Sequence, residues 1–557
     1  MASSPHKHMD VIHAVQEYVN KMLKEPGMKV LVLDKETAGI VSMVYTQSEI
    51  LQKEVFLFEK IDNVSKEKML HMKGVYFIRP TQENINLITD ELKDPKYSKY
   101  HFFFSNTVNK VFLDDIAKAD EQDVVAEIQE YFGDFFAINP DTFSLNMQSI
   151  LSKRSLGWAM NINRLVDGVF SSMLALKKKP IIRYSSNSEA TRYLSEKIAE
   201  RMSRERDLFD FRKTNESLLL ILDRKDDPIT PLLHQWTYQA MIHELLTISN
   251  NRVSLANAPN IKEDLKEVVL SLDHDAFYRE NLYKNFGDLG ASIKDLVDQY
   301  QDKANTNANI QTIDDMKKFI ENYPNFLSFS KTVSKHVALM DELSRIVSVN
   351  NLMDISEIQQ ELACNHDHSS VYSRIIEIIN DPKYSEKDKL VVVMLYSIRY
   401  EDGHVWELKE NLTRVGLSPK QISLIDSLKS YAGAQLREGD LLGTKNIFSF
   451  AKSVVKRGLQ GVSNIYTQHK PLLHEILDNI LKNKLKEQSY PFLSPTNTKE
   501  RPQDIIIFMI GGITFEEALT IYTFNSLNVG VCRVVLGGTN VLNCNQFLED
   551  ISETLRK

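Results

Sequence analysis

Six short apolar runs, four in the first 223 residues and two near the end, restrict the fold more than any other feature of the chain. Each holds five to seven residues with almost continuously apolar side chains, which is typical of strands buried on both faces of a parallel sheet. Polar stretches that could form helices separate them, so the pattern predicts repeated β–α units. The runs are residues 29–34, 74–79, 101–105, 217–223, 504–510 and 530–536.

The middle of the chain, from about residue 238 to 485, has a different pattern. Strand-like runs nearly vanish there, with residues 390–395 as an ambiguous case, and apolar residues recur at helical spacing. We therefore expect a long helical insertion that splits an α/β domain, whose final strands come from the end of the chain. An example of the helical spacing is the series Phe326, Val333, Met340 and Val347.

Two stretches are predicted to be loops. Residues 302–309 are polar and have no periodicity, and residues 439–461 combine glycines with several lysines and an arginine. The second stretch could touch anionic lipid, at about 1 kcal/mol for each basic residue near such a surface. A mobile loop is the favoured interpretation.

Composition narrows the class of protein. The chain of 557 residues is 43% hydrophobic and 25% charged with a net charge of −8, which fits a globular protein and not an obvious nucleic-acid binder. Three cysteines without a CxxC fit a reducing compartment. The longest apolar run, residues 505–513, is too short to span a bilayer, and no signal-peptide core opens the chain. We expect a cytosolic protein whose membrane contact is peripheral.

Motifs of common enzyme classes are missing. The chain has no GxGxxG, no GxxxxGK[ST] and no GxSxG. His243 and His474 are each followed by glutamate, as in HExxH, but Thr247 and Asp478 stand where the second histidine belongs. We expect no metal and no cofactor.

Two weaker patterns leave alternatives open. Cys364, His366 and His368 could ligate zinc, although a fourth ligand is lacking and a solvated loop is the favoured interpretation. The glycine pairs 511–512 and 537–538 follow apolar runs, so they could cradle phosphate or merely turn the chain, and we favour the turn.

Five charged residues, 223–227, follow the fourth apolar run. Clustered carboxylates can hold a metal or act as acid and base, as in an α/β enzyme such as a nucleotide-sugar transferase that would also use the turn at 511–512. The alternative is a turn whose charges pair with each other and with backbone amides.

The segment 223–246 is the most distinctive part of the chain, because a buried strand ends in charges, passes a Pro-x-x-Pro turn and enters an amphipathic helix. It resembles the hallmark of the SM (Sec/Munc) family, which binds membrane-fusion SNARE proteins. Residues 466–473, 508–518 and 537–539 resemble further family blocks in the same order, and the likeness covers nearly the whole chain. The signature residues are Asp223, Arg224, Asp227, Pro228, Pro231, His234, Thr237 and Gln239.

Residues 9–34 and 40–62 are most similar to the endosomal, vacuolar-protein-sorting branch of that family. The resemblance implies an arch-shaped α/β plus α fold with two parallel-sheet domains and a large, mainly helical domain inserted in the second. The implied domains are residues 1–133, then 134–240 with 475–557, then 241–474, in which 241–350 carries a SNARE-templating hairpin and 351–474 forms the remainder.

The implied function is that of a non-enzymatic regulator of SNARE-mediated vesicle fusion. It would bind a trans-Golgi or endosomal syntaxin (a Qa-SNARE) and promote SNARE-complex assembly during sorting to the endosome or vacuole. The resemblance further implies a monomer that reaches Golgi and endosomal membranes through its partners, among them a Rab-effector tether. An SM protein of another trafficking branch is the alternative within the family.

The resemblance also implies where partners bind. Asp34 and Glu59 match positions of a syntaxin-binding cleft, although Asp34 could instead cap a helix and Glu59 could simply be solvated. Residues 111–145 resemble the region that holds the syntaxin N-terminal peptide in the family, and the resemblance implies a pocket formed by Leu113, Val125, Ile128 and Glu130. We expect a helix in which Val125 and Ile128 face one way, or else pack inward against the sheet.

Pro324 interrupts the predicted helical run 312–349. A proline inside a helix removes a hydrogen bond and costs about 3 kcal/mol, so we expect a break between two helices. In the family, a proline at this place is the hinge of the hairpin that templates SNARE assembly, and Pro324→Ala is expected to lengthen the helix and favour assembly.

Overall fold

The computed structural model describes residues 9–63, 67–148, 157–211, 216–308, 313–364, 368–401, 403–437, 441–442, 465–495 and 501–553. The chain divides into two compact units. The first consists of Met1–Arg224, Glu475–Ile513 and Thr520–Val541, and the second of Lys225–His474, Thr514–Leu519 and Leu542–Lys557. The three-domain division drawn from the family resemblance stays a prediction.

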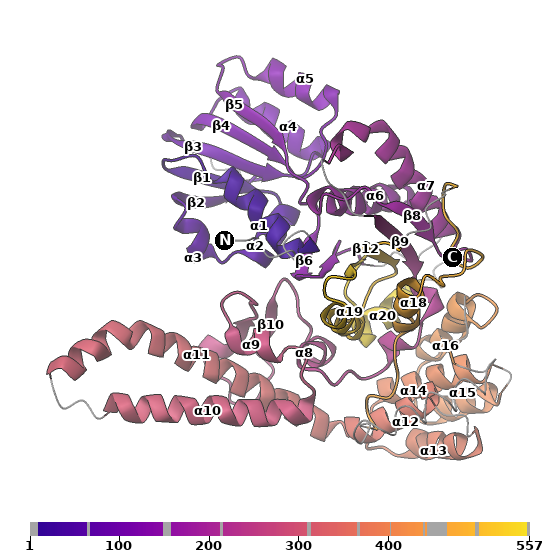
Figure 1. Ribbon diagram of the computed structural model, residues 1–557. Coiled ribbons are helices and arrows are strands. Elements are labelled where there is room, and N and C mark those ends of the chain that lie inside the picture. Colours follow the sequence, from indigo (N-terminus) through magenta and orange to yellow (C-terminus); the bar gives the residue numbers. More distant parts are fainter. Residues whose placement is uncertain are drawn as a thin grey trace. The chain divides into compact units, whose positions relative to one another are not determined.

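The first unit contains a five-stranded parallel sheet with the order β2-β1-β3-β4-β5 (Figure 1). Three of its strands were predicted from apolar runs. The two edge strands, β2 and β5, were not, because their outward side chains are exposed and their sequences are not continuously apolar. The strands are β1 (Lys29–Leu33), β2 (Val55–Lys60), β3 (Met69–Ile78), β4 (Tyr97–Phe104) and β5 (Val125–Glu130).

Helices cover both faces of this sheet, because successive strand residues point to opposite sides. Leu31 and Leu33 pack with residues of α1 and α2, whereas Val30 and Val32 pack with residues of α4 and α5. The helices are α1 (Val11–Met22), α2 (Lys35–Val44), the short α3 (Gln47–Leu51), α4 (Gln82–Leu92) and α5 (Lys110–Ala119).

The first unit also holds a six-stranded sheet with the order β6-β7-β13-β12-β9-β8. The pair β6 and β7 is antiparallel and the other pairs are parallel. Strand β12 lies directly beside β9, with Phe508 opposite Ile221, although the helical insertion separates them in sequence. The strands are β6 (Phe136–Asn139), β7 (Thr142–Ser144), β8 (Ile181–Tyr184), β9 (Ser217–Asp223), β12 (Asp504–Ile510) and β13 (Arg533–Gly538).

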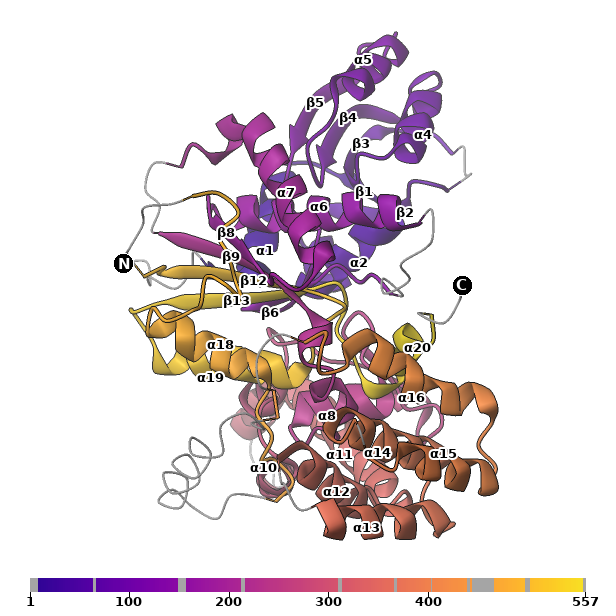
Figure 2. The same cartoon turned by 90° about the vertical axis from the view of Figure 1, so that its right-hand side faces the viewer.

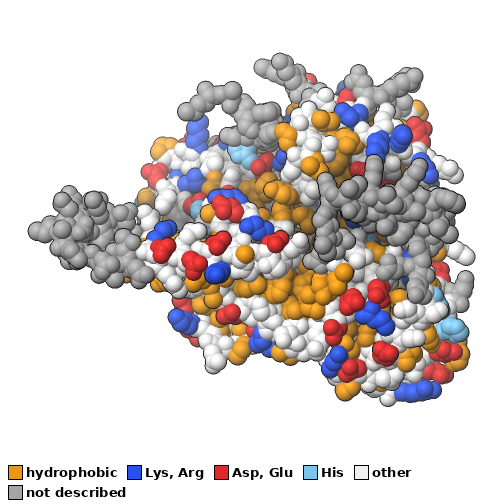
Figure 3. Space-filling model, turned by 60° about the horizontal axis from the view of Figure 1, so that its bottom comes forward, with side chains coloured by type: hydrophobic (Ala, Val, Ile, Leu, Met, Phe, Trp, Pro, Cys, Tyr) orange, Lys and Arg blue, Asp and Glu red, His pale blue; other side chains and the backbone are white. Residues whose placement is uncertain are grey.

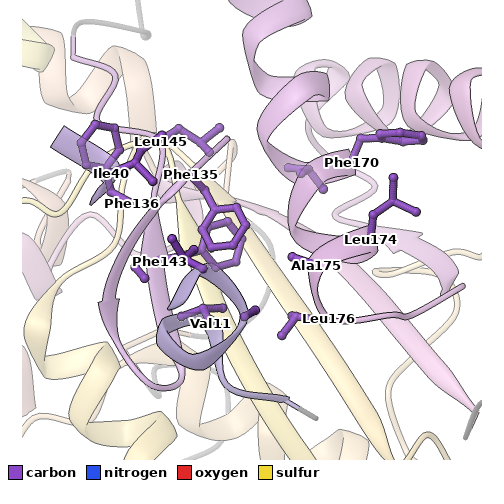
Figure 4. Close-up of a cluster of buried hydrophobic side chains, with 14 of the residues drawn as sticks. Val11, Ile40, Phe135, Phe136, Phe143, Leu145, Phe170, Leu174, Ala175 and Leu176 are labelled. Carbon is purple, nitrogen blue, oxygen red and sulfur yellow. The ribbon is translucent and has the colours of Figure 1, made fainter. Parts of the chain in front are cut away.

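One hydrophobic core joins the two sheets of the first unit. It runs from the α1 and α2 face of the first sheet to the face of the second sheet covered by α6 (Gly157–Ala175) and α7 (Glu189–Arg204). Figure 4 shows part of it, where Phe135 and Phe143 lie near Val11 of α1 and near Leu176, which follows α6. Figure 2 shows α6 and α7 together on one side of this sheet.

The second unit is mainly helical, with one small antiparallel pair of strands. Helices α18 (Leu472–Leu481) and α19 (Phe515–Leu527) run across the unit boundaries, and α20 (Cys544–Glu553) returns to the second unit. Its other elements are α8 (Tyr238–Leu246), β10 (Arg252–Ser254), β11 (Glu267–Val269), α9 (Ala276–Asn281), α10 (Phe286–Ala308), α11 (Ile313–Val349), α12 (Leu352–Cys364), α13 (His368–Asn380), α14 (Glu386–Arg399), α15 (Val405–Arg414) and α16 (Pro419–Ala432).

One local prediction for this unit is corrected, and one ambiguous case is resolved. Residues 302–308 are not a loop but the end of α10, since a helix paired on one side can be polar throughout its outer face. The ambiguous run 390–395 is helical, because every residue from Asp388 to Arg399 of α14 is buried and the helix therefore lacks a polar stripe. Among the described residues, no helix is long and apolar enough to cross a membrane.

Candidate protein-interaction sites

The signature segment begins where β9 ends, and its first carboxylate holds a neighbouring helix. Asp223 accepts a hydrogen bond of 2.6 Å from the Ser188 hydroxyl, and that hydroxyl accepts the N–H of Thr191 as the N-cap of α7. Arg224, which comes next, is 1% exposed. These groups are buried structural contacts and not an open acid–base pair.

Asp227 ties two distant parts of the second unit together. Its carboxylate accepts the N–H of Thr230 at 3.0 Å, the hydroxyl of Thr230 at 2.6 Å and the N–H of Leu472 at 3.0 Å. Pro228 is buried, and Pro231 lies in a short 3-10 turn, Thr230–Leu232, where its fixed φ suits the first turn of a helix.

The rest of the signature attaches this turn to the helices. His234 donates its backbone N–H to Gln359 Oε1 at 2.9 Å, and its Nδ1 lies 2.9 Å from the same oxygen. Thr237 starts α8 by accepting the N–H of Met241 at 2.8 Å, and the Gln239 N–H donates to the carbonyl of Leu282 at 2.9 Å. The segment that resembles the family most closely is therefore a structural junction.

The weaker chemical patterns gain no support. Within the described residues, no group of three or more His, Cys, Asp or Glu side chains is placed to hold a metal ion. His368 bonds the Tyr396 hydroxyl at 2.7 Å, and His366 lies outside the described residues. Gly511 and Gly512 have φ of 90° and 94°, as a turn requires, and a Cβ on Gly537 would lie 2.1 Å from the Phe143 ring.

Asp34 directly follows β1 and caps α2, as in one of the two interpretations left open. Its Oδ1 accepts the N–H of Thr37 at 2.8 Å, and its Oδ2 accepts the Arg79 N–H at 2.7 Å and the Asn84 amide at 2.9 Å. The side chain is buried, and both of its oxygens already accept hydrogen bonds from within the protein. The sequence signal for this role is the threonine three residues after the aspartate, which completes a capping box.

A cavity of about 600 Å³ lies beside Asp34, at the carboxyl ends of β1 and β3. Doubly wound sheets with this strand order usually bind ligands at that place. Here the two arginines that line the cavity are already paired with a carboxylate. Arg79 Nε lies 3.0 Å from Asp134, and Arg164 lies 3.3 Å from the other oxygen of the same carboxylate. The Asp34 carboxylate occupies the helix N-terminus where an anion would otherwise bind.

Glu59 lies on the edge strand β2 and is half-buried. It accepts a hydrogen bond of 2.9 Å from the Tyr97 hydroxyl. Phe56 and Leu57 on the same strand are 55% and 38% exposed. An edge strand with exposed apolar side chains and one carboxylate is a surface that another chain can cover.

The predicted peptide-pocket residues lie on α5 and β5, with Leu113 exposed on the helix. The expected helix at Val125–Ile128 is wrong, because these residues form a strand. A shift in register places Val125 opposite Tyr100 and Ile128 opposite Phe102, so a bulge turns both toward the same core cluster.

Glu130 ends the same strand. Burial raises the pKa of its carboxyl, partly offset by the hydrogen bond of 2.7 Å that it accepts from the Val108 N–H. Val125 and Ile128 are half-buried. The structure thus places the four residues on α5 and β5, and their role in peptide binding stays a prediction.

The expected break at Pro324 is also wrong, since α11 continues through it. The two arms of the hairpin, α10 and α11, run side by side (Figure 1), and their contacts support the helix around the proline. The ring of Tyr300 stacks on Phe326 at 5.7 Å, and the ammonium of Lys303 lies 4.0 Å from the ring centre of Phe329. Whether Pro324 acts as a hinge stays a prediction.

Exposed apolar side chains are present near the proline, where Tyr323 and Leu327 are 47% and 43% exposed. Figure 3 shows hydrophobic side chains gathered on the face that it draws, with acidic and basic side chains around them.

Most of the basic stretch 439–461 lies outside the described residues.

Comparison with known proteins defines the class. The model of the Sec1 family matches residues 29–550, and the chain belongs to that family. The chain is 78% identical to vacuolar protein sorting-associated protein 45 of Dictyostelium discoideum, over 98% of this chain and 97% of that protein. It is 49% identical to the human protein of the same name, over 98% and 96%.

Solved structures agree. The structure described as the SM protein Vps45 in complex with the Qa SNARE Tlg2 matches with a TM-score of 0.90 and 41% identity, over 98% of both chains. By contrast, protein transport protein sec1 of Dictyostelium discoideum is 23% identical, over 94% of each chain. The vacuolar-protein-sorting branch expected from the sequence is confirmed.

Proposed function

We propose that this chain is a non-enzymatic regulator of SNARE-mediated vesicle fusion. It binds a Qa-SNARE of the trans-Golgi or endosomal syntaxin type and promotes assembly of that SNARE with its partners, in transport toward the endosome or vacuole. Binding does this work, because a surface shifts SNARE assembly only by its different affinity for the unassembled and assembled states.

The observation that carries this proposal is likeness over the full length of a protein solved with its SNARE. Vps45 in complex with Tlg2 covers 98% of this chain at a TM-score of 0.90. The high identity to proteins named for vacuolar sorting favours this branch over the other trafficking branches.

The arrangement of the signature supports a protein without catalysis. Asp223 and Asp227, which the enzyme alternative would need, accept hydrogen bonds from a helix cap and from buried backbone amides. The glycine turn at 511–512 has no basic side chain at phosphate-binding spacing. The nucleotide-sugar transferase alternative is not favoured.

Three surfaces would meet the SNARE. The first is the edge strand β2 with Glu59, together with Asp34, whose carboxylate fixes the start of α2 and the residue Arg79 that follows β3. The second is the surface of α5 and β5 with Leu113, Val125, Ile128 and Glu130, for the N-terminal peptide. The third is the α10–α11 hairpin with Pro324, for templating.

The same proposal covers partners and location. The chain acts as a monomer, reaches Golgi and endosomal membranes peripherally through its SNARE, and a Rab-effector tether is a further partner. It needs no cofactor.

Isothermal titration of the full chain with the cytosolic part of an endosomal Qa-SNARE tests the proposal. We expect submicromolar binding that weakens when the SNARE lacks its N-terminal peptide, and that weakens equally in Ile128→Arg. Leu527→Arg is the matched control, because Leu527 is 79% exposed and belongs to none of the three surfaces. Absence of binding to every syntaxin in a panel would overturn the proposal, whereas binding that ignores the peptide would remove the second surface alone.

A further inference from the structure

A buried polar cluster lies at the base of the hairpin, where α11 meets α8 and α9. His336 of α11 is fully buried and uses both ring nitrogens: Nε2 lies 2.8 Å from Asp275 Oδ2, and Nδ1 lies 2.7 Å from the hydroxyl of Tyr238. Asp275 also caps α9 by accepting the N–H of Tyr278 at 2.9 Å.

The donors and acceptors of this cluster match in one arrangement. A carboxylate only accepts, so His336 donates Nε2–H to Asp275 and accepts at Nδ1 the hydroxyl proton of Tyr238. Lys335 pairs with Asp275 and donates to the carbonyl of Val269 at 3.0 Å. Every polar group of the histidine is therefore satisfied at one rotational setting of α11.

Aromatic rings restrict the histidine further. The ring centre of Phe277 lies 4.7 Å from that of His336, and the ring of Tyr278 stacks against it at 6.5 Å with 12° between the planes. A shift of α11 by one residue would turn the helix by about 100° and leave buried donors and acceptors unpaired. The cluster thus fixes the rotation of α11 about its axis.

The fixed rotation carries along the helix to the candidate hinge. Pro324 lies twelve residues before His336, which is about 18 Å along a continuous helix. At the other side of the cluster, Tyr238 stands between the signature residues Thr237 and Gln239, and the latter bonds the Tyr278 hydroxyl. The buried side chains of Tyr238, His336 and Asp275 therefore connect the signature segment with the hairpin.

We propose that His336, together with Asp275 and Tyr238, is a positioning residue that sets the direction in which the α10–α11 hairpin presents its SNARE-facing surface. This proposal rests on the proposed function, since it states which residues set the direction of the templating hairpin. A purely stabilising role for the cluster is the competing interpretation.

The test compares variants that keep the volume of the cluster. His336→Phe removes both hydrogen bonds, Tyr238→Phe removes one, and His336→Gln restores a donor and an acceptor. The matched control is His368→Phe, because His368 is a hydrogen-bonded histidine of α13 in the same unit but outside the hairpin. Melting curves define a temperature at which all four variants are folded.

Two readouts are taken at that temperature. The first is the distance between spin labels on cysteines at Leu327 and Glu280, both exposed, in a Cys364→Ser background; the other two cysteines are buried. The second is the rate of SNARE-complex formation. We expect His336→Phe and Tyr238→Phe to shift or broaden the distance distribution and to slow assembly by about fivefold or more, with recovery in His336→Gln and no effect in His368→Phe.

An unchanged distance distribution in folded His336→Phe, or an equal change in His368→Phe, overturns the positioning role. If the wild-type chain fails to speed SNARE assembly at all, the proposed function fails instead, and the distance measurement still decides whether the cluster sets the direction of the hairpin.

Discussion

The carboxylate of Asp227 accepts the backbone N–H of Leu472 at 3.0 Å, across 245 residues of sequence. The side chain of His469 lies 3.0 Å from the hydroxyl of Thr230, which Asp227 also binds. Two sequence blocks that resemble the family, 223–246 and 466–473, are thus partners in one junction. Their common appearance in the chain has a physical reason, because each block supplies hydrogen-bond partners to the other.

Asp227→Ala should destabilise the second unit strongly. The substitution leaves the N–H groups of Thr230 and Leu472 buried without an acceptor, and we expect a loss of about 3 kcal/mol in the free energy of unfolding. Urea unfolding followed by circular dichroism measures it. Asp207→Ala is the control, since the Asp207 side chain is fully exposed, and an equal effect of both substitutions would contradict the junction.

Asp34→Asn and Glu59→Lys should separate indirect from direct contributions to SNARE binding. Asn puts an amide N–H₂ against the donors of Arg79 or Thr37, so we expect a loss of about 1–3 kcal/mol in stability together with weaker binding. Glu59→Lys should weaken binding at a smaller cost in stability, about 1 kcal/mol, because it removes only the acceptor of the Tyr97 hydroxyl on a half-buried edge strand. Melting curves and titrations on the same samples decide this, and binding that survives both substitutions would exclude the first surface.

Buried histidines should make the second unit sensitive to acid. Burial lowers the pKa of His336 and of His469 from 6.5, with Asp275 and Asp227 opposing the shift. Below about pH 6.5 the unfolded chain therefore binds protons that the folded chain does not, and stability falls as pH drops toward the lower folded pKa, by up to about 1.4 kcal/mol per pH unit for each proton. Urea unfolding at pH 7.5, 6.5 and 5.5 should show a smaller loss in His469→Gln than in the wild type. Parallel curves would contradict the assignment.

Glu516 should act in the opposite direction. Burial, with the charge of Glu517, raises the pKa of its carboxyl to about 7 from 4.5, so ionisation favours the unfolded chain as pH rises from about 4.5 to 7. Glu516→Gln is expected to raise the melting temperature at pH 8 and to change it little at pH 5. The exposed Glu280→Gln serves as control, and a stabilisation that is equal at both pH values would argue against a raised pKa.

Pro324→Ala should strengthen a helix that is already continuous. The substitution restores a backbone hydrogen bond and removes a clash, worth up to about 3 kcal/mol, without adding a turn of helix. We therefore expect nearly unchanged helicity by circular dichroism and, if Pro324 is the hinge of the templating hairpin, faster SNARE assembly, because the continuous form of α11 becomes more stable. An assembly rate equal to that of the wild type would contradict a hinge role for Pro324.

The central strands could be predicted from the sequence because burial on both faces requires an almost continuous run of apolar residues. Strands β9 and β12 coincide with their apolar runs, since all seven residues of each are buried. Edge strands such as β5 escaped because one side is exposed and a bulge breaks the alternation. The same bulge brings Val125 and Ile128 to one face. The sequence predicted this shared face correctly, but from helical spacing in a segment that is a strand.

The partners of the candidate site were beyond sequence reasoning. Asp34 was expected at the end of a strand, and the capping alternative could be read from Thr37, but Arg79 and Asn84 reach the carboxylate through tertiary structure. His336 and Asp275 lie 61 residues apart, and neither belongs to a recognisable motif. Their pairing depends on how α9 packs against α11, which no local pattern specifies.

The position of β12 between β9 and β13 imposes an order on synthesis. When β9 leaves the ribosome it has no neighbour on one side, and the strand that will pair with it is made only after the whole helical insertion, from residue 504 onward. Throughout that interval the nascent chain displays an apolar strand edge that invites pairing with other chains. We therefore expect the unpaired edge of β9 to be a site of misassembly during synthesis, and a chain interrupted shortly before residue 504 would leave that edge permanently unpaired.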